Sequence, residues 1–204
     1  MNSLNELQLD ALTEVFSIGA GRAALSLSEI VGDEVRISVP SVQVISSNDI
    51  SSTTLSLNSG RFGAVSQNFS GPFNAEALLL FTEEQALKIV SDMMDSQMSL
   101  EELAEFEHEA MCELGNIILN ACLSAMADML NFTLDSSLPN YTVASADDIL
   151  TRLKKNTNQP YIMILHIDLA IENQRTAGNL VFLLSSASLN NLVTHIDQFL
   201  DPIS

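Results

Sequence analysis

The chain has 204 residues, a length that suits one large domain or two small domains in close contact, and 47% of its residues are hydrophobic, enough to form a buried core. Its formal net charge of −18, from 8 Lys and Arg against 26 Asp and Glu, argues against nucleic acid and anionic membranes as partners, because both need clustered cations. No apolar run reaches the roughly 18 residues of a membrane span, and the first residues lack the basic and apolar stretches of a signal peptide, so we expect a cytoplasmic protein.

The first half of the chain begins with a helical pattern and continues with strands. Apolar residues recur at helical spacing from Leu4 to about Val31, and Gly32 can end this helix. Strands are predicted at 35–39, 42–45, 61–69 and 75–81. The polar run 46–59 is either a loop or an exposed strand. Thr82 is a suitable N-cap for a second helix that continues to about Met94.

The second half begins after a joint predicted at Ser96 to Met98. Ser99 and Glu102 have the spacing of a capping box, which starts a long helix from Leu100 to about Leu130, either continuous or broken once. The remaining elements are then predicted in this order: a strand at 141–144, a short helix at 147–155, strands at 161–171 and 179–184 joined around Asn173 and Gly178, and a last helix from Ser185 or Ser186 to about Leu200.

The order of elements in the second half repeats that of the first: a helix, strands, and a closing helix behind a hydroxyl cap. Duplicated units of this kind usually pack around a pseudo-two-fold axis. We therefore predict an α/β (α+β) fold, internally duplicated, with a pseudo-two-fold mixed β-sheet and helices packed on it. One domain would span residues 1–204 as two repeats, 1–96 and 97–204, with an extra polar insert at 146–159.

One motif occurs in both halves with the same internal spacing. Glu113 and Asn116 stand three residues apart, and Pro139 lies 23 positions beyond Asn116. The corresponding residues of the first half, each 99 positions earlier, are Glu14, Ser17 and Pro40. This shared spacing indicates two related halves, each presenting a carboxylate and a second polar group from a helix.

On a helix, the motif residues belong to a longer polar stripe. Glu109, Glu113, Asn116 and Asn120 share one face, and the equivalent positions of the first half are Asp10, Glu14, Ser17 and Gly21. An amide can donate to one group and accept from another, so it can hold a water, and a nearby carboxylate can pair with a cation on a partner. Any surface helix shows a polar stripe, so the evidence for a site is the shared spacing to a proline.

These residues resemble the CheC family of chemotaxis phosphatases, which includes the relatives CheX and FliY. The family motif is Asp or Ser, three residues, Glu, two residues, Asn, 22 residues and Pro. Glu113, Asn116 and Pro139 match it, with Glu109 at the leading position. The first half matches it through Asp10, Glu14 and Pro40, with Ser17 at the Asn position. The run from Glu14 to Ala24 is also similar to the family's N-terminal helix signature, and the resemblance spans nearly the whole chain.

The resemblance implies hydrolysis of the aspartyl phosphate on a CheY-type response regulator in chemotaxis signalling. Asn116 would orient the attacking water, Glu113 would pair with the active-site lysine of the regulator, and Pro139 would shape the backbone near the site. The chain would need no cofactor of its own, because the regulator would supply both the phosphorylated Asp and its Mg²⁺. The 3 histidines are scattered and form no H-x-x-x-H pair, so we predict no metal site.

The two copies of the motif differ at the amide position. A serine hydroxyl is shorter than a carboxamide and has one donor rather than two, so we predict a weak or inactive first site, where Glu14 can still contribute to docking. Glu109 keeps an acid at the leading position, with a longer side chain than Asp. We therefore predict one working site, in the second half.

Two other functions remain open. The chain could be an adaptor that docks a response regulator, the receptor-modifying deamidase CheD or a flagellar switch component without hydrolysis, although the retained Asn116 favours hydrolysis. A purely structural duplicated domain is disfavoured by the intact second motif.

Overall fold

The computed structural model describes residues 4–57, 60–94, 99–155, 158–171 and 174–201. In chain order its elements are α1 (Glu6–Val31), β1 (Val35–Ser46), a short 3₁₀ helix η1 (Ser47–Asp49), β2 (Arg61–Ser70), β3 (Ala75–Thr82), α2 (Glu83–Met93), α3 (Leu100–Met129), β4 (Asp135–Ser136), β5 (Asn140–Ser145), α4 (Ala146–Lys155), β6 (Tyr161–Ile171), β7 (Gln174–Leu184) and α5 (Ser186–Leu200).

The predicted helices are all present, and their ends follow local capping chemistry. Asn5 and Gln8 form a capping box at the start of α1, and Gly32 ends it with a left-handed backbone at φ 77°. Ser99 and Glu102 form the predicted box at the start of α3, which is continuous. The joint predicted at 96–98 lies outside the described residues, so the boundary between the repeats stays a prediction.

The strands differ from the predicted pattern in three places. The two short strands expected at 35–39 and 42–45 are one strand, β1, whose pairing with β6 shifts register between Ser38 and Ser41. Pro40 lies in this irregularity, because proline has no N–H to donate to the ladder. Strand β7 begins at Gln174, so Gly178 lies inside it, and Asn173 lies outside the described residues. Strand β4 was not predicted.

The described strands form one seven-stranded sheet in the order β1-β6-β7-β3-β2-β4, with β5 also paired to β2. Strands β1, β2 and β3 of the first half correspond to β5, β6 and β7 of the second half. The pairing of β1 with β6 is therefore matched by that of β5 with β2, and β3 pairs with its counterpart β7 at the centre. The α/β class and the pseudo-two-fold duplication are therefore confirmed. All of these pairings are antiparallel, so the expectation of mixed strand directions was wrong. Short connections join β2 to β3 and β6 to β7, and a two-fold axis through the centre makes the β3–β7 pair antiparallel as well.

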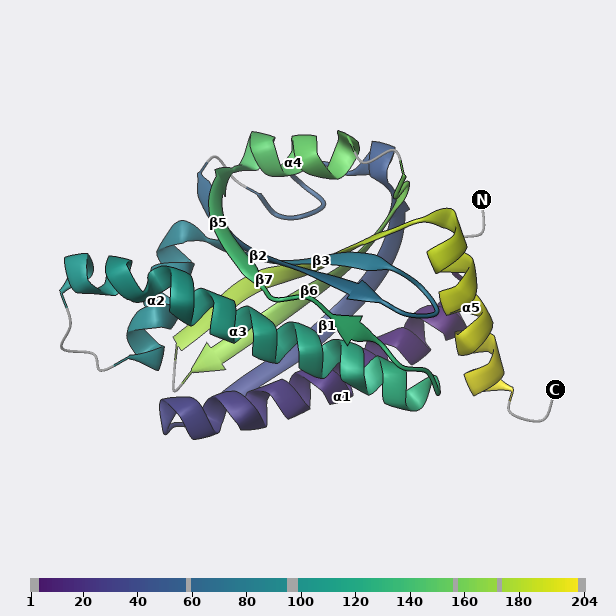
Figure 1. Cartoon of the computed structure of the whole chain (residues 1–204), viewed down its shortest axis with the longest axis horizontal. Coiled ribbons are helices and arrows are strands. Elements are labelled where there is room, and N and C mark those ends of the chain that lie inside the picture. Colours follow the sequence, from purple (N-terminus) through teal and green to yellow (C-terminus); the bar gives the residue numbers. More distant parts are fainter. Residues whose placement is uncertain (1–3, 58–59, 95–98, 156–157, 172–173, 202–204) are drawn as a thin grey trace.

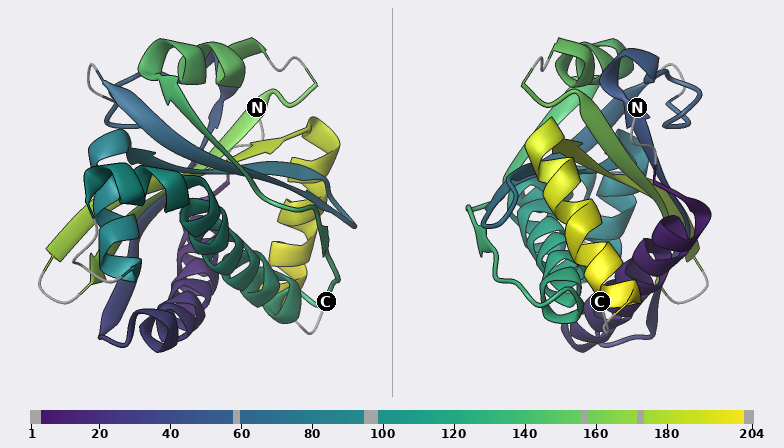
Figure 2. Two further views of the ribbon diagram at one scale, coloured as in Figure 1. Left: turned by 60° about the vertical axis from the view of Figure 1, so that its left-hand side comes forward. Right: turned by 90° about the vertical axis from the view of Figure 1, so that its right-hand side faces the viewer.

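Helices cover the two faces of the sheet unequally (Figure 1). Helices α1 and α3 lie side by side against one face, above a large core that also includes parts of α2 and α5. Helix α4 and the segment around η1 cover the opposite face above a smaller core, in which Ile50, Leu55, Ile149 and Leu153 are buried. Figure 2 shows this layering from two further directions.

Helix α3 is long and apolar enough to cross a membrane by length and composition. Of the apolar 18-residue window on which this comparison rests, 56% is buried inside the protein. Core helices of soluble proteins pass the same test, and the burial fits that explanation.

Helices α1 and α3 run in opposite directions and approach closely where they cross (Figure 1). A Cβ atom added to Gly19 would lie 2.5 Å from the Cα of Cys122, so only a glycine allows the two backbones this distance. At the surface of the same pair, Arg22 Nη1 lies 2.7 Å from Asp128 Oδ2. Gly21 is also helical, but a Cβ there would meet nothing within 4 Å.

We expect Gly19→Ala and Gly21→Ala to change stability in opposite directions. The first forces α1 away from α3 and should lower the free energy of unfolding by about 1–3 kcal/mol. The second adds a good helix former in open space and should raise it by about 0.5–1 kcal/mol. Urea unfolding monitored by circular dichroism measures both, and a Gly19→Ala protein as stable as the wild type would contradict the close approach.

Candidate functional site

The predicted site residues lie on the two paired helices and on the strand segments that follow them. Glu109 and Glu113 are exposed on α3, and Asn116 is half-buried one turn beyond Glu113. Pro139 is half-buried immediately before β5. The structure therefore brings the second copy of the motif together on one side of α3.

The first copy lies on α1, where Asp10, Glu14 and Ser17 are exposed. The two copies are far apart, because the helices are antiparallel and Glu113 lies beside Ile30 at the far end of α1. Glu14 precedes Ile30 by sixteen residues, about 24 Å along a helix. Each motif must therefore act by itself.

The side chain of Asn116 is held by two other amides. Asn120, one turn further on, places its Nδ2 2.7 Å from Asn116 Oδ1 and 2.8 Å from the Asn116 carbonyl oxygen. Gln67 on β2 places its Nε2 3.4 Å from Asn116 Oδ1 and 2.7 Å from the carbonyl oxygen of Ser137. The side-chain amide of the motif residue Asn116 is thus held by one residue of the same helix and one residue of the sheet.

Gln67 is not among the predicted site residues, although its position in the sequence carries a signal. It is only 1% exposed, and it lies between the buried Val65 and Phe69 on the face of β2 that meets the helices. A glutamine at an apolar position of a buried strand indicates a specific polar partner. That partner lies 49 residues away in the chain, which sequence spacing cannot show.

Two contacts tie α3 to the segment around Pro139. The thiol of Cys112 lies 3.9 Å from the carbonyl oxygen of Pro139, and burial raises the pKa of this thiol. The hydroxyl of Tyr141 on β5 donates to the Glu107 carboxylate. The backbone after the motif proline is therefore anchored to the helix that carries Glu113.

The equivalent groups of the first half are arranged differently. The Ser17 hydroxyl donates to the Thr13 carbonyl oxygen of its own helix at 2.7 Å, which uses its one donor. Gly21, at the position of Asn120, has no side chain that could hold Ser17.

An apolar pocket of about 230 Å³ adjoins the carboxylates of the second motif. Its walls are Ile30 of α1, Phe106 and Ala110 of α3, and Met93 and Met94 at the end of α2, with Glu109 and Glu113 at its edge. The exposed fractions of Ile30 and Phe106 are 49% and 39%, respectively, which is high for such apolar side chains. This pocket was not predicted, because it needs three helices to be brought together.

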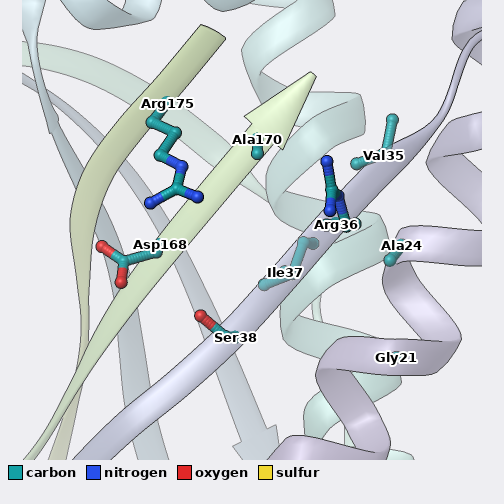
Figure 3. Close-up of a pocket in the computed structure, with 9 residues that line it drawn as sticks. All are labelled: Gly21, Ala24, Val35, Arg36, Ile37, Ser38, Asp168, Ala170 and Arg175. Carbon is teal, nitrogen blue, oxygen red and sulfur yellow. The ribbon is translucent and has the colours of Figure 1, made fainter. Parts of the chain in front are cut away.

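A second pocket, of about 470 Å³, lies between α1 and the edge of the sheet (Figure 3). Arg36 of β1 and Arg175 of β7 line it together with Asp168 and Gly21. Neither Glu14 nor Ser17 of the first motif lines this pocket. Within the described part of the chain, no group of three His, Cys, Asp or Glu side chains could hold a metal ion.

Comparisons with known proteins agree with this fold. No protein-family model matches the chain. CheC1 of Halobacterium salinarum is 26% identical over 143 residues, which are 70% of this chain and 72% of that protein. The CheY-P phosphatase CheC of Bacillus subtilis is 25% identical over 148 residues, 70% of this chain and 69% of that protein. The crystal structure of Thermotoga maritima FliY matches with a TM-score of 0.79 at 22% identity, over 96% of this chain and 98% of that one.

The duplicated antiparallel sheet with helices α1 and α3 on one face has the same fold as the solved FliY structure. In sequence the chain is similar to proteins named CheC and FliY, at 25–27% identity. The predicted resemblance to the CheC family is therefore confirmed, whereas the roles of Glu113, Asn116 and Pro139 stay a prediction.

The Tyr141–Glu107 hydrogen bond should give the protein an alkaline limit to its stability. Burial, followed by the hydrogen bond and charge of Glu107, raises the pKa of Tyr141 well above its ordinary value of 10.0. The phenol then stays neutral in the folded protein while it ionises in the unfolded chain above about pH 10, so its stabilising contribution is complete below that pH and is lost above it.

We expect the urea midpoint of the wild type to fall more between about pH 9 and pH 11 than that of Tyr141→Phe, because phenylalanine does not ionise. Other alkaline groups, such as the buried thiol of Cys122, contribute equally to both proteins. Parallel pH profiles for the two proteins would show that Tyr141 does not set this limit.

Proposed function

We propose that this protein is a phosphatase that hydrolyses the aspartyl phosphate of a CheY-type response regulator, with one working site at Glu113 and Asn116. The observation that carries the proposal is the Asn116 amide, held by Asn120 at 2.7 Å, one turn from an exposed Glu113. The relative named as the CheY-P phosphatase CheC supports the same reaction.

The chemistry needs a water aligned with the phosphorus and the leaving aspartate. Phosphoryl transfer depends mainly on positioning and electrostatics. A helix that inserts one amide into the regulator's active site is therefore sufficient to accelerate hydrolysis. Asn116 would orient the water, and Glu113 would pair with the regulator's active-site lysine. The Mg²⁺ would come from the regulator, so the reaction would need no cofactor from this chain and would take place in the cytoplasm.

The apolar pocket beside Glu113 supports a protein substrate. Its walls from α1, α2 and α3 form an open surface that continues directly into the two carboxylates. An apolar contact area next to charged groups suits the docking of a folded regulator, because burial gives affinity and the charges give orientation. The motif proline Pro139 lies on the strand side of the same helix, where its anchored backbone supports the Gln67–Asn116 contact.

The state of the first motif supports a single working site. The Ser17 hydroxyl is used within its own helix, and the neighbouring helix position is Gly21. Glu14 remains exposed and can contribute to docking.

The alternative function is an adaptor that binds a response regulator, CheD or a flagellar switch component without hydrolysis. Asn116 favours the phosphatase, because an adaptor has no need of a positioned amide at the centre of the contact. Phosphate release from a phosphorylated regulator separates the two functions.

The two motif amide positions should contribute unequally to activity. We expect Asn116→Ala to lower kcat/KM for phosphate release by about 100-fold, the usual effect of removing one positioned polar group. Ser17→Ala should leave the rate close to that of the wild type. Equal losses of kcat/KM in both variants, or an undiminished rate in Asn116→Ala, would contradict the one-site proposal.

The pocket should determine affinity rather than the rate of chemistry. We expect Phe106→Ser to raise KM for the phosphorylated regulator about tenfold, or about 1.4 kcal/mol, without changing kcat. Leu7→Ser is the matched control, since Leu7 is an exposed apolar residue of α1 at 61% exposure that does not line the pocket. If both serine variants behave alike, the pocket is not the docking surface.

A further inference from the structure

We propose that Gln67 is a positioning residue: together with Asn120 it turns the Asn116 amide so that Oδ1 faces the protein and Nδ2 is offered to the partner. The proposal rests on the proposed phosphatase function, because it describes how the same site presents its amide. It assigns a role to a buried residue outside the motif.

The orientation of Asn116 follows from groups that can only accept hydrogen bonds. The backbone carbonyl oxygen of Asn116 lies 2.8 Å from an Asn120 side-chain atom, which must therefore be the donor Nδ2. The same Nδ2 lies 2.7 Å from the Asn116 side chain, so the atom that it meets there must be the acceptor Oδ1.

The contacts of Gln67 independently indicate the same orientation of the Asn116 amide. Its side-chain atom 2.7 Å from the Ser137 carbonyl oxygen must be the donor Nε2. That Nε2 lies 3.4 Å from the Asn116 side chain, again on the Oδ1 atom. Two carbonyl groups from different parts of the chain thus fix one amide orientation.

The consequence for chemistry is that Asn116 acts as a donor. A carbonyl oxygen has two acceptor positions, and Asn120 and Gln67 fill both on Oδ1. No acceptor for Asn116 Nδ2 is found among the described residues, so its two hydrogens remain for the partner. One Nδ2 hydrogen can bond to a lone pair of the attacking water, so that the other lone pair of this water is free to attack phosphorus. The other Nδ2 hydrogen can donate to a phosphoryl oxygen.

Burial of Gln67 also has a cost in folding free energy. Its Oε1 is buried and has no hydrogen-bond partner within the described chain, which is unfavourable for folding. Its neighbours on this face of β2, Val65 and Phe69, are apolar. An apolar side chain would remove this cost, and the carbonyl oxygen of the exposed Ser137 could then bond to water.

The first half lacks the whole arrangement. On β6, the counterpart of β2, the residues that face the helices are apolar: Met163, Leu165, Ile167 and Leu169. Ser17 bonds to its own helix, and Gly21 replaces Asn120. The polar support therefore occurs only beneath the motif that retains its amide.

The test is Gln67→Met, which keeps the size of the side chain and removes its donor. We expect kcat for phosphate release to fall about tenfold while KM stays unchanged, because the amide loses alignment and the docking surface does not. The urea midpoint should stay equal or rise, since the unpartnered Oε1 is removed. Unchanged kcat, or a lowered midpoint with a matching loss of folded protein, would overturn the proposal.

Asn179→Leu is the matched control. Among the described residues, Asn179 is the second buried amide with an unpartnered oxygen, and its Nδ2 donates to the Leu55 carbonyl oxygen on the opposite face of the sheet. This variant should keep the kcat of the wild type. If it lowers kcat as much as Gln67→Met does, the effect belongs to buried amides in general and the proposal fails.

Neutron diffraction separates this proposal from the proposed function. It locates the two Nδ2 hydrogens of Asn116, which should point away from Asn120 and Gln67. Hydrogens directed at Asn120 would overturn the orientation even in an active enzyme. If the wild type releases no phosphate from any regulator, the phosphatase proposal and the rate effect of Gln67 fail, while the diffraction result still decides the orientation.

Discussion

The antiparallel pairing of β3 with β7 is the constraint on which the rest of the molecule depends. It joins the two halves at the centre of the sheet and places their hairpins back to back. Because the halves are related across this pair, their first helices must lie on the same face and meet there. The close crossing of Gly19 over Cys122 is the result, and it holds the two motif-bearing helices in fixed positions.

This symmetry of the backbone does not extend to the chemistry. Both helices present a carboxylate outward, but only α3 has amides beneath and beside its second polar residue. Burying Gln67 with one unpaired oxygen opposes folding, and the protein accepts this cost beneath α3, whereas the residues of β6 that face the helices are apolar. A duplicated scaffold can therefore retain both copies of a helix while maintaining the polar interior of just one.

The sequence predicted what depends on neighbouring residues. The helical period placed Glu113 and Asn116 on one face, and capping chemistry located the starts of α2 and α3. It did not predict the antiparallel strand directions, the pocket between Ile30 and Phe106, or the contact of Gln67 with Asn116, because each joins residues far apart in the chain. The prolines were identified by spacing alone, and their structural settings proved different.

Pro40 has a consequence for how the protein behaves in a crowded cell. Strand β1 is 12 residues long and forms an outer edge of the described sheet, where unpaired backbone groups could recruit a strand from another chain. Pro40 interrupts this edge near its middle, removing one donor where the register shifts. The proline of the first motif therefore opposes strand pairing between copies of the chain, an effect that does not depend on Ser17 or on any catalytic role of that motif.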